Sequence, residues 1–422
     1  MNMNLSSGSH QEAYFVIAIL LLAVIFPARC VAQSQVSSDD AQQLRKLLEQ
    51  MQAQMNKMQE ERRRLADQKL PVERTMTRRF IQLAVLVILI AGTISLCRSQ
   101  TSSELNAYFQ QNVGLSQDQI AAIRGGQAVT KVAKSRIPDE IFVFGAVYVK
   151  ARPEQYLTLA YDFDRLRKIP GYEAIEKFSN PPQLSDLKGY TYDSEDIKAL
   201  KKCKPDDCQL QVPASSIEAL QKSVDWSAPD AEEKLNQSLH EIVIKRLLAY
   251  QKDGNQVLGV YNDKENPTNV AEQFKYMLSY SQLLPKILPD FCNYLLDYPK
   301  SKPANTEDMF YWTKVKFGLK PTLRVVQVVS MHSNNPHEPA YTIAEKQLYS
   351  SHYFETALDF TFCVRGDDPK QPGFYLIKFM GSEQAGLTGF KGSIVRKVAV
   401  GRSASSLQKS LTAIKDTLEK NQ

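Results

Sequence analysis

One histidine has neighbours that suit acid–base chemistry. His352 lies between Tyr349 and Tyr353. The carboxylates of Glu345 and Glu355 are near it in sequence, and an imidazole beside a carboxylate moves protons readily near neutral pH. No Gly-x-Ser-x-Gly elbow and no catalytic-cysteine pattern accompanies it, so a structural or ligand-lining role for His352 is favoured. The sequence therefore predicts no catalytic residue.

A second segment is close to a phosphate-binding loop but lacks its cation. Gly381-Ser-Glu-Gln-Ala-Gly-Leu-Thr388 has the glycine spacing, yet Leu387 stands where a lysine would reach the phosphates. The residues that follow, 393–400, have the pattern of a strand and not of a helix that could hold an anion. We therefore interpret these glycines as a hairpin loop.

Metal binding is not predicted either. The five histidines include no pair at helical metal-ligand spacing. Cys203 and Cys208, separated by Lys-Pro-Asp-Asp, would need two further zinc ligands that nothing nearby supplies, whereas a small disulfide loop needs only the pair. Cys292 and Cys363 lie in apolar segments and are expected to be buried. No cofactor is expected.

The position of the large domain is indicated by an apolar run at residues 80–97. Arg78 and Arg79 precede this run and favour the cytoplasmic side for its N-terminal end. Its length is near the minimum for a helix that crosses a bilayer. Residues 76–98 are thus predicted to be a transmembrane helix or signal anchor, and the chain beyond them is predicted to be exported.

An earlier apolar run, residues 14–31, leaves three interpretations open. Residues 1–32 resemble a signal peptide with small residues near Ala28 and Ala32, but no lysine or arginine precedes the run. If uncut, the run is a second membrane helix, and if cut, one anchor remains. Alternatively, translation starts at Met76, whose following sequence is a better signal peptide. The large domain is exported in each case.

The basic stretch between the two runs, residues 33–75, has a coiled-coil-like pattern. The seam positions are Leu44, Leu48, Met51, Met55, Met58, Arg62 and Leu65. Residues 44–65 are one candidate for homo-oligomerisation. A solvated charged helix, or a segment absent from the mature protein, explains the same pattern.

Composition excludes one class of partner. The formal net charge of the chain is +6, and the exported part has no block of cations interleaved with aromatic residues. Nucleic-acid binding therefore has no electrostatic basis.

Beyond the membrane segment the patterns predict an α+β domain. Residues 99–140 read as a helical spacer, 141–150 as a buried strand followed by a helix from Pro153, and 174–178 as a short strand. Residues 193–300 read as helices, of which 229–252 has an apolar stripe through Leu235, Leu239, Ile242, Val243, Leu247 and Tyr250. Strand patterns follow at 310–317, 323–331, 340–349, 354–364, 374–380 and 393–400, and then an amphipathic helix from about Ser403. An antiparallel sheet covered by that helix is expected.

This order resembles the helix-grip fold of the SRPBCC or START-like superfamily. The segment Gly145-Ala-Val-Tyr-Val-Lys-Ala-Arg-Pro-Glu-Gln-Tyr-Leu-Thr-Leu-Ala-Tyr-Asp162, followed by Ile169-Pro-Gly-Tyr172, is similar to its first strand, first helix and second-helix turn. The resemblance covers residues 141–192 and 309–420, with residues 193–300 inserted as a helical subdomain. It implies a hydrophobic cavity between the sheet and the C-terminal helix that binds lipids or other apolar molecules. The chain also resembles exported proteins of environmental bacteria, which implies no activity.

These patterns together predict a tethered binding protein of the bacterial cell envelope. It would be anchored in the inner membrane, with its main domain in the periplasm or outside the cell, and would bind a hydrophobic molecule or lipid without catalysis. The candidate ligand-binding residues are Tyr148, Tyr349, His352, Phe360 and Tyr375. The alternative is an envelope interaction or scaffold protein that uses the helical insertion and the coiled coil.

Overall fold

The computed structural model describes residue 53 and residues 104–169, 171–261, 267–280, 284–316, 320–366, 372–384 and 386–420. The chain divides into two compact units, Met1–Thr101 and Ser102–Gln422, and every described residue except Ala53 belongs to the second. The segments predicted at residues 1–32, 33–75 and 76–98 lie outside the described residues. Among the helices that are described, none combines the length and the apolar composition needed to cross a bilayer.

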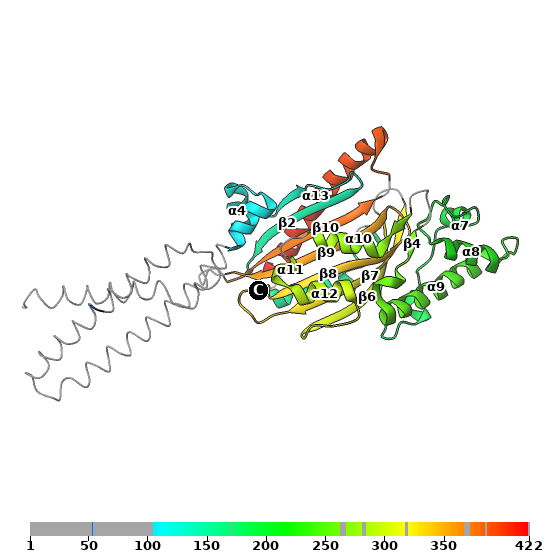
Figure 1. Cartoon of the computed structure of the whole chain (residues 1–422), viewed down its shortest axis with the longest axis horizontal. Coiled ribbons are helices and arrows are strands. Elements are labelled where there is room, and N and C mark those ends of the chain that lie inside the picture. Colours follow the sequence, from blue (N-terminus) through cyan, green and yellow to red (C-terminus); the bar gives the residue numbers. More distant parts are fainter. Residues whose placement is uncertain are drawn as a thin grey trace, which may run out of the picture. The chain divides into compact units, whose positions relative to one another are not determined.

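An eight-stranded antiparallel sheet forms the centre of the second unit (Figure 1). Its spatial order is β1-β2-β10-β9-β8-β7-β6-β3. The strands are β1 (Val129–Ala133), β2 (Glu140–Val149), β3 (Tyr172–Lys177), β6 (Thr306–Lys316), β7 (Pro321–His332), β8 (Tyr341–Ser350), β9 (Phe354–Arg365) and β10 (Phe374–Gln384). Strands β6 to β10 follow one another along the chain and pair in order, as a meander of hairpins does.

In the second unit, helices occupy four stretches of the chain. The first contains the π-helix η2 (Phe109–Val113) and α4 (Gln117–Arg124), and α5 (Pro153–Ala160) and α6 (Phe163–Leu166) follow β2. Between β3 and β6 lies the helical block, residues 194–297: α7 (Ser194–Leu200), α8 (Ala214–Ser223), α9 (Ala231–Asp253), η4 (Gly254–Val257), β4 (Val260–Tyr261), β5 (Thr268–Asn269), α10 (Val270–Tyr280), α11 (Leu284–Ile287) and α12 (Pro289–Asp297). The 3-10 turn η3 (Leu184–Leu187) precedes it, and α13 (Gly389–Lys420) ends the described chain.

The strands alternate their side chains between two faces of the sheet, and different helices cover each face. Gly145, Lys378, Thr361 and Ile343 are in register across β2, β10, β9 and β8 and share one face. A Cβ atom on Gly145 would lie 2.7 Å from side-chain atoms of Leu407 and Leu411, so this face is the one on which α13 packs. We call it the α13 face.

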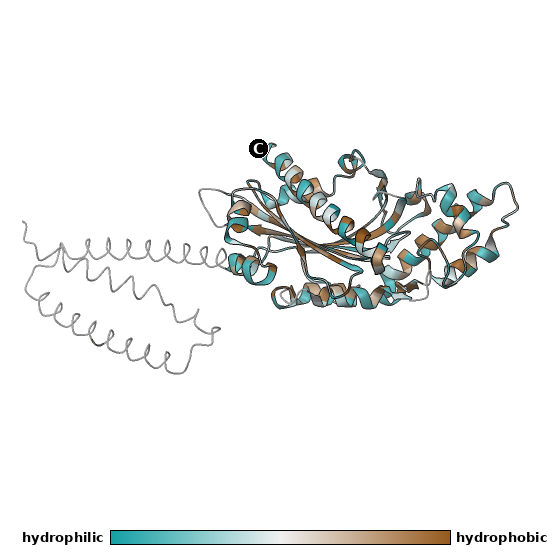
Figure 2. Cartoon of the chain, turned by 90° about the horizontal axis from the view of Figure 1, so that it is seen from above, coloured by the Kyte–Doolittle hydropathy of each residue, from teal (hydrophilic) through white to brown (hydrophobic). Residues whose placement is uncertain are grey.

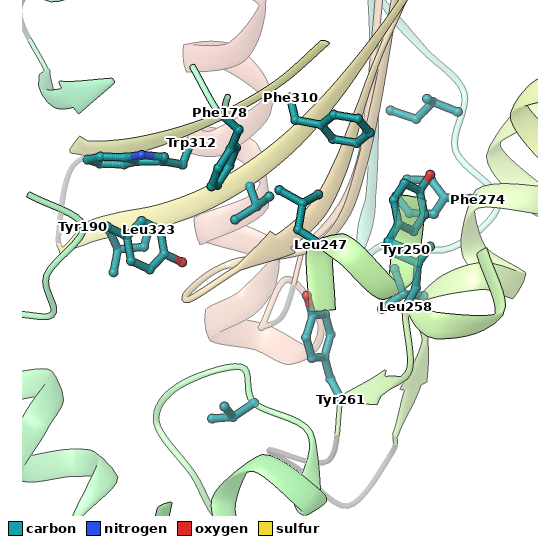
Figure 3. Packing of buried hydrophobic residues seen from close by; sticks show 14 of the residues in the cluster. Phe178, Tyr190, Leu247, Tyr250, Leu258, Tyr261, Phe274, Phe310, Trp312 and Leu323 are labelled. Carbon is teal, nitrogen blue, oxygen red and sulfur yellow. The ribbon is translucent and has the colours of Figure 1, made fainter. Parts of the chain in front are cut away.

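The opposite face is rich in aromatic residues, and we call it the aromatic face. Phe144, Phe379, Phe360 and Ala344 are in register on it. The helical block packs on one part of this face, in a buried cluster that includes Leu247, Tyr250, Phe310 and Trp312 (Figure 3). In Figure 2, α13, which runs toward the label C, lies on one side of the sheet and helices of the helical block lie on the other.

The lead-in helices cover the remaining part of the aromatic face. Phe109, Ile120 and Ile123 from η2 and α4 are buried against Phe144 and its neighbours. Helix α4 begins with a capping box in which the Ser116 hydroxyl accepts from the Gln119 amide at 3.2 Å. The residues predicted to be a helical spacer are therefore part of the body of this unit.

The observed class is α+β, with a large antiparallel sheet and a long C-terminal helix, as the sequence predicts. Three expectations are wrong. The glycine-rich segment from Gly381, interpreted as a hairpin loop, instead ends strand β10 and leads into α13, which begins at Gly389. Residues 393–400 are helical and not a strand, because α13 begins at Gly389 and its Ile and Val residues continue a helix that packs farther along through Leu407 and Leu411. Residues 129–133, placed in the helical spacer, form the edge strand β1, which pairs with β2.

The cysteines occupy two kinds of position. Cys203 and Cys208, the pair considered above, form a disulfide in the helical block. Cys292 and Cys363 are free and buried, on α12 and β9.

We predict that the contact of α13 with β2 is sensitive to a single methyl group. Gly145→Ala should lower the free energy of unfolding by about 1–3 kcal/mol, because the new Cβ overlaps Leu407 and Leu411. Leu411→Ala makes room for the new methyl group. The double variant should therefore lose less free energy of unfolding than the sum of the losses in the two single variants. Urea denaturation measures these differences.

The matched control is Gly401→Ala on α13, where a Cβ meets nothing within 4 Å. It should be neutral or stabilise by up to about 1 kcal/mol through helix propensity. Equal stability of Gly145→Ala and the unaltered protein would contradict the packing described here.

Candidate functional site

An apolar pocket of about 70 Å³ lies between the helical block and the aromatic face. Side chains from α9 form one wall, and Val325 of β7 with Leu348 and Tyr349 of β8 form the opposite wall. Val212, Pro213 and Ser216 close it from the start of α8, and Val257 and Leu258 close it after α9. Figure 3 shows Leu247, Tyr250 and Leu258 in this region of the buried cluster.

The wall contributed by α9 follows from helical spacing. The lining residues Leu239, Ile242, Val243, Arg246, Leu247 and Tyr250 recur at the three- and four-residue intervals of one helix face. Five of these belong to the apolar stripe that the sequence predicts. Leu239, Leu247 and Tyr250 are buried, whereas Ile242 and Val243 are only half-buried because the pocket lies beside them.

Arg246 is the cation of this wall. Arg246 is half-buried, and no ion pair between it and another described residue is formed. Arginine side chains bind carboxylates and phosphates through charge-assisted hydrogen bonds. A half-buried arginine beside an apolar pocket therefore suits the acidic end of an amphipathic molecule.

Two tyrosines supply neutral polar groups on another side of the pocket. The Tyr192 and Tyr349 hydroxyls lie 2.5 Å apart. Burial, with the other hydroxyl close by, raises the pKa of Tyr349 well above its ordinary value, and burial also raises the pKa of Tyr192. Both hydroxyls are therefore neutral hydrogen-bonding groups at physiological pH, so Arg246 is the charged group that lines the pocket.

The pocket is too small for a whole lipid. A cavity of about 150 Å³ holds benzene, so about 70 Å³ accommodates only a few methylene groups. The apolar end of a chain fits, and the rest of the molecule has to remain outside.

The five ligand-binding candidates do not converge on this pocket. Tyr349 lines it. Phe360 is buried on the aromatic face under the helical block, and Tyr148 and Tyr375 pack edge to face, 4.9 Å between ring centres, beside the lead-in helices. None of the four lies on the α13 face, where the helix-grip resemblance places a ligand.

His352, the fifth candidate, has a carboxylate partner that sequence proximity did not indicate. Its Nε2 lies 3.0 Å from Oδ2 of Asp196 on α7, and both side chains are buried. Lys320 Nζ lies 3.5 Å from the other oxygen of Asp196. Glu355 instead accepts a hydrogen bond from Thr268 Oγ1 at 2.5 Å. The His352–Asp196 contact therefore connects the helical block to the β8–β9 turn, which is a structural role.

The α13 face carries an unexpected polar cluster on the central strands. Glu345 and Asp359 are directly opposite each other on β8 and β9. Burial and then the neighbouring Glu345 raise the pKa of Asp359 to about 7. The cluster consists of Tyr161, Tyr311, Arg324, Glu345, Asp359 and Lys378, all half-buried.

Lys346 is a buried amine that sequence reasoning missed. It lies on the aromatic face behind the pocket wall, where Nζ donates to the Tyr250 hydroxyl at 3.1 Å and to Asn255. Its ammonium is 4.7 Å from the centre of the Phe274 ring. Burial lowers the pKa of Lys346 to about 7. Tyr250 in turn donates to Gln327 at 2.6 Å, so this network holds the inner end of the pocket wall.

No protein-family model matches the chain, and no curated protein is significantly similar to it. Function is therefore inferred from the chemistry of the pocket and its surroundings.

Lys346→Met should stabilise the protein in a pH-dependent way. The pKa of Lys346 falls to about 7 on folding, so the folded protein either releases the proton of this lysine or keeps a buried charge. This destabilisation of the folded state is full below pH 7. It declines as the pH rises toward about 10.4, the pKa of a lysine in the unfolded chain. We expect a gain of on the order of 1–3 kcal/mol at pH 6 that shrinks by pH 9.5, measured by urea denaturation.

Lys245→Met, an exposed position on α9, is the control and should show no such pH-dependent gain. A gain for Lys346→Met that is equal at both pH values would contradict the buried position of the amine.

Proposed function

We propose that this protein binds a small amphipathic anion in the pocket between α9 and the aromatic face. The apolar end of the ligand enters the pocket, and its carboxylate or phosphate lies at Arg246. The observation that carries the proposal is the half-buried Arg246 on an otherwise apolar wall of α9. Pockets that are mainly apolar with a few placed polar groups are typical ligand sites.

Binding without chemistry is the function that the side chains favour. The polar groups that line the pocket are Arg246, Ser216 and the tyrosines, and the described residues place no acid–base pair among them. The Tyr192–Tyr349 pair offers hydroxyl groups for orientation. A fatty acid, or the end of an acyl chain of an acidic lipid, has the right combination of groups.

Export and tethering fit such a ligand. We propose that the N-terminal apolar runs hold the protein in the bacterial inner membrane with this unit outside the cytoplasm, where acyl chains are abundant. The order of sheet and C-terminal helix supports a helix-grip relationship. The proposed pocket, however, lies on the face opposite the one where that relationship implies a cavity.

A second candidate is a polar ligand on the α13 face. The half-buried charges of Glu345, Asp359 and Lys378 on central strands favour it, because charged side chains that still reach solvent can contact a polar ligand. Such a ligand would be hydrophilic, in contrast to the one proposed for the pocket.

Titration calorimetry with decanoate and with 1-decanol tests the proposal on the purified protein. Val243→Trp fills the pocket and should weaken decanoate binding more than tenfold. Arg246→Gln should weaken decanoate binding by about 5- to 20-fold, the loss of one charge-assisted contact, and leave 1-decanol binding nearly unchanged.

Leu248→Trp, the same substitution type at an exposed position of α9, is the control and should bind as the unaltered protein does. Absence of decanoate and decanol binding, with no lipid found by mass spectrometry of extracts, would contradict the proposal. Loss of binding in Tyr161→Phe but not in Val243→Trp would move the ligand to the α13 face.

A further inference from the structure

The first turns of α13 expose an unusual concentration of large apolar side chains. Phe390 is 86% exposed, Ile394 57%, Val395 52% and Val398 48%. We call these four residues the exposed strip. The other large hydrophobic residues that are exposed in the described part of the chain lie singly on four different elements: Val132, Leu184, Leu248 and Ile287. Scattered residues of that kind are ordinary, but a contiguous strip indicates a contact surface.

The exposed strip faces away from the sheet. Phe390, Ile394 and Val398 recur every four residues and therefore lie along one side of the helix. Leu407 packs on the α13 face, and Val398 lies nine residues before it. At about 100° per residue, a separation of nine residues places Val398 on the side of α13 opposite Leu407. The strip is thus not part of the packing that holds α13 to the sheet.

The same turns stand partly apart from the body. A hollow of about 430 Å³ lies between Pro138 and the inner side of these turns, lined there by Gly389, Ser393 and Val400. Figure 1 shows the orange-red start of α13 extending beyond the strands. Arg396 attaches these turns to the body by donating to the Pro138 carbonyl at 2.7 Å and to Ser135 Oγ at 2.8 Å.

The charge around the exposed strip has one sign. Lys391, Lys397 and Arg402 are exposed on the same turns, and no ion pair among the described residues involves them. The sequence contains no Asp or Glu between Glu383 and Asp416. A second copy of the same surface would bring these cations together, which is unfavourable, whereas a negatively charged surface would neutralise them.

We propose that the first turns of α13 bind the surface of a bilayer containing anionic lipids. Amphipathic helices of this kind lie in the interface with their apolar face about 5–10 Å deep, and their cations contact the headgroups. Phe390, Ile394 and Val398 enter the acyl boundary, and Lys391, Lys397 and Arg402 bind lipid phosphates. This surface is separate from the pocket of the proposed function and does not depend on it.

Electron paramagnetic resonance of the full chain in lipid nanodiscs tests this contact. A nitroxide is placed at Val395→Cys, in a background with Cys30→Ser and Cys97→Ser. In phosphatidylcholine with one quarter phosphatidylglycerol, its accessibility to oxygen should exceed its accessibility to a water-soluble nickel chelate. In pure phosphatidylcholine, the nitroxide should be more accessible to the chelate than to oxygen. The same result is expected in the anionic nanodiscs when Lys391→Glu, Lys397→Glu and Arg402→Glu are combined. High salt should act in the same direction by screening.

A nitroxide at Ser406→Cys, exposed farther along α13, is the control and should stay in water in every nanodisc. Circular dichroism confirms that the charge-reversed variant is folded. A Val395 nitroxide that remains chelate-accessible in anionic nanodiscs overturns the proposal. Short nitroxide–nitroxide distances between copies, without lipid dependence, also overturn it and identify the strip as a dimer contact.

Discussion

Each strand of the eight-stranded sheet directs alternate side chains to opposite faces, and both faces of its central strands have to be covered within one chain. The sequence of β2 determines which face of the sheet α13 covers. Gly145 leaves space for Leu407 and Leu411, so α13 packs closely on that face. The aromatic side chains on the other face then require a second cover. The lead-in helices and the helical block provide it, and the apolar pocket lies in this second interface.

The two interfaces differ in chemistry. Beneath α13, apolar contacts near β2 give way to half-buried charges on β8, β9 and β10. Beneath the helical block, the core is apolar and aromatic, and its buried polar groups are held by networks such as Lys346–Tyr250–Gln327. A ligand with an acyl chain matches the second interface. The exposed strip on α13 belongs to neither, since its side chains point away from the sheet.

Much of the fold follows from periodicity. Alternation predicts strands β6 to β10 to within a few residues, and helical spacing predicts α5, α9 and the second half of α13. Residues 393–400 have a strand pattern because Ile394, Val395 and Val398 are β-branched, and this local preference is overridden by continuation of helix α13.

The site was harder to predict. Tyr349 is among the residues that the sequence predicts to bind a ligand, and Arg246 is not. Arg246 is the one cation at the helical spacing of the apolar stripe of α9, and a cation within such a stripe indicates a polar contact. Asp196 meets His352 across 156 residues of sequence, which no local pattern reveals.

A crystal structure of the protein with a bromine-tagged alkyl carboxylate tests the central claim most directly. An anomalous peak between Val243 and Tyr349, with the carboxylate at Arg246, is the predicted result. A peak on the α13 face, or none in a crystal soaked to saturation, would contradict it.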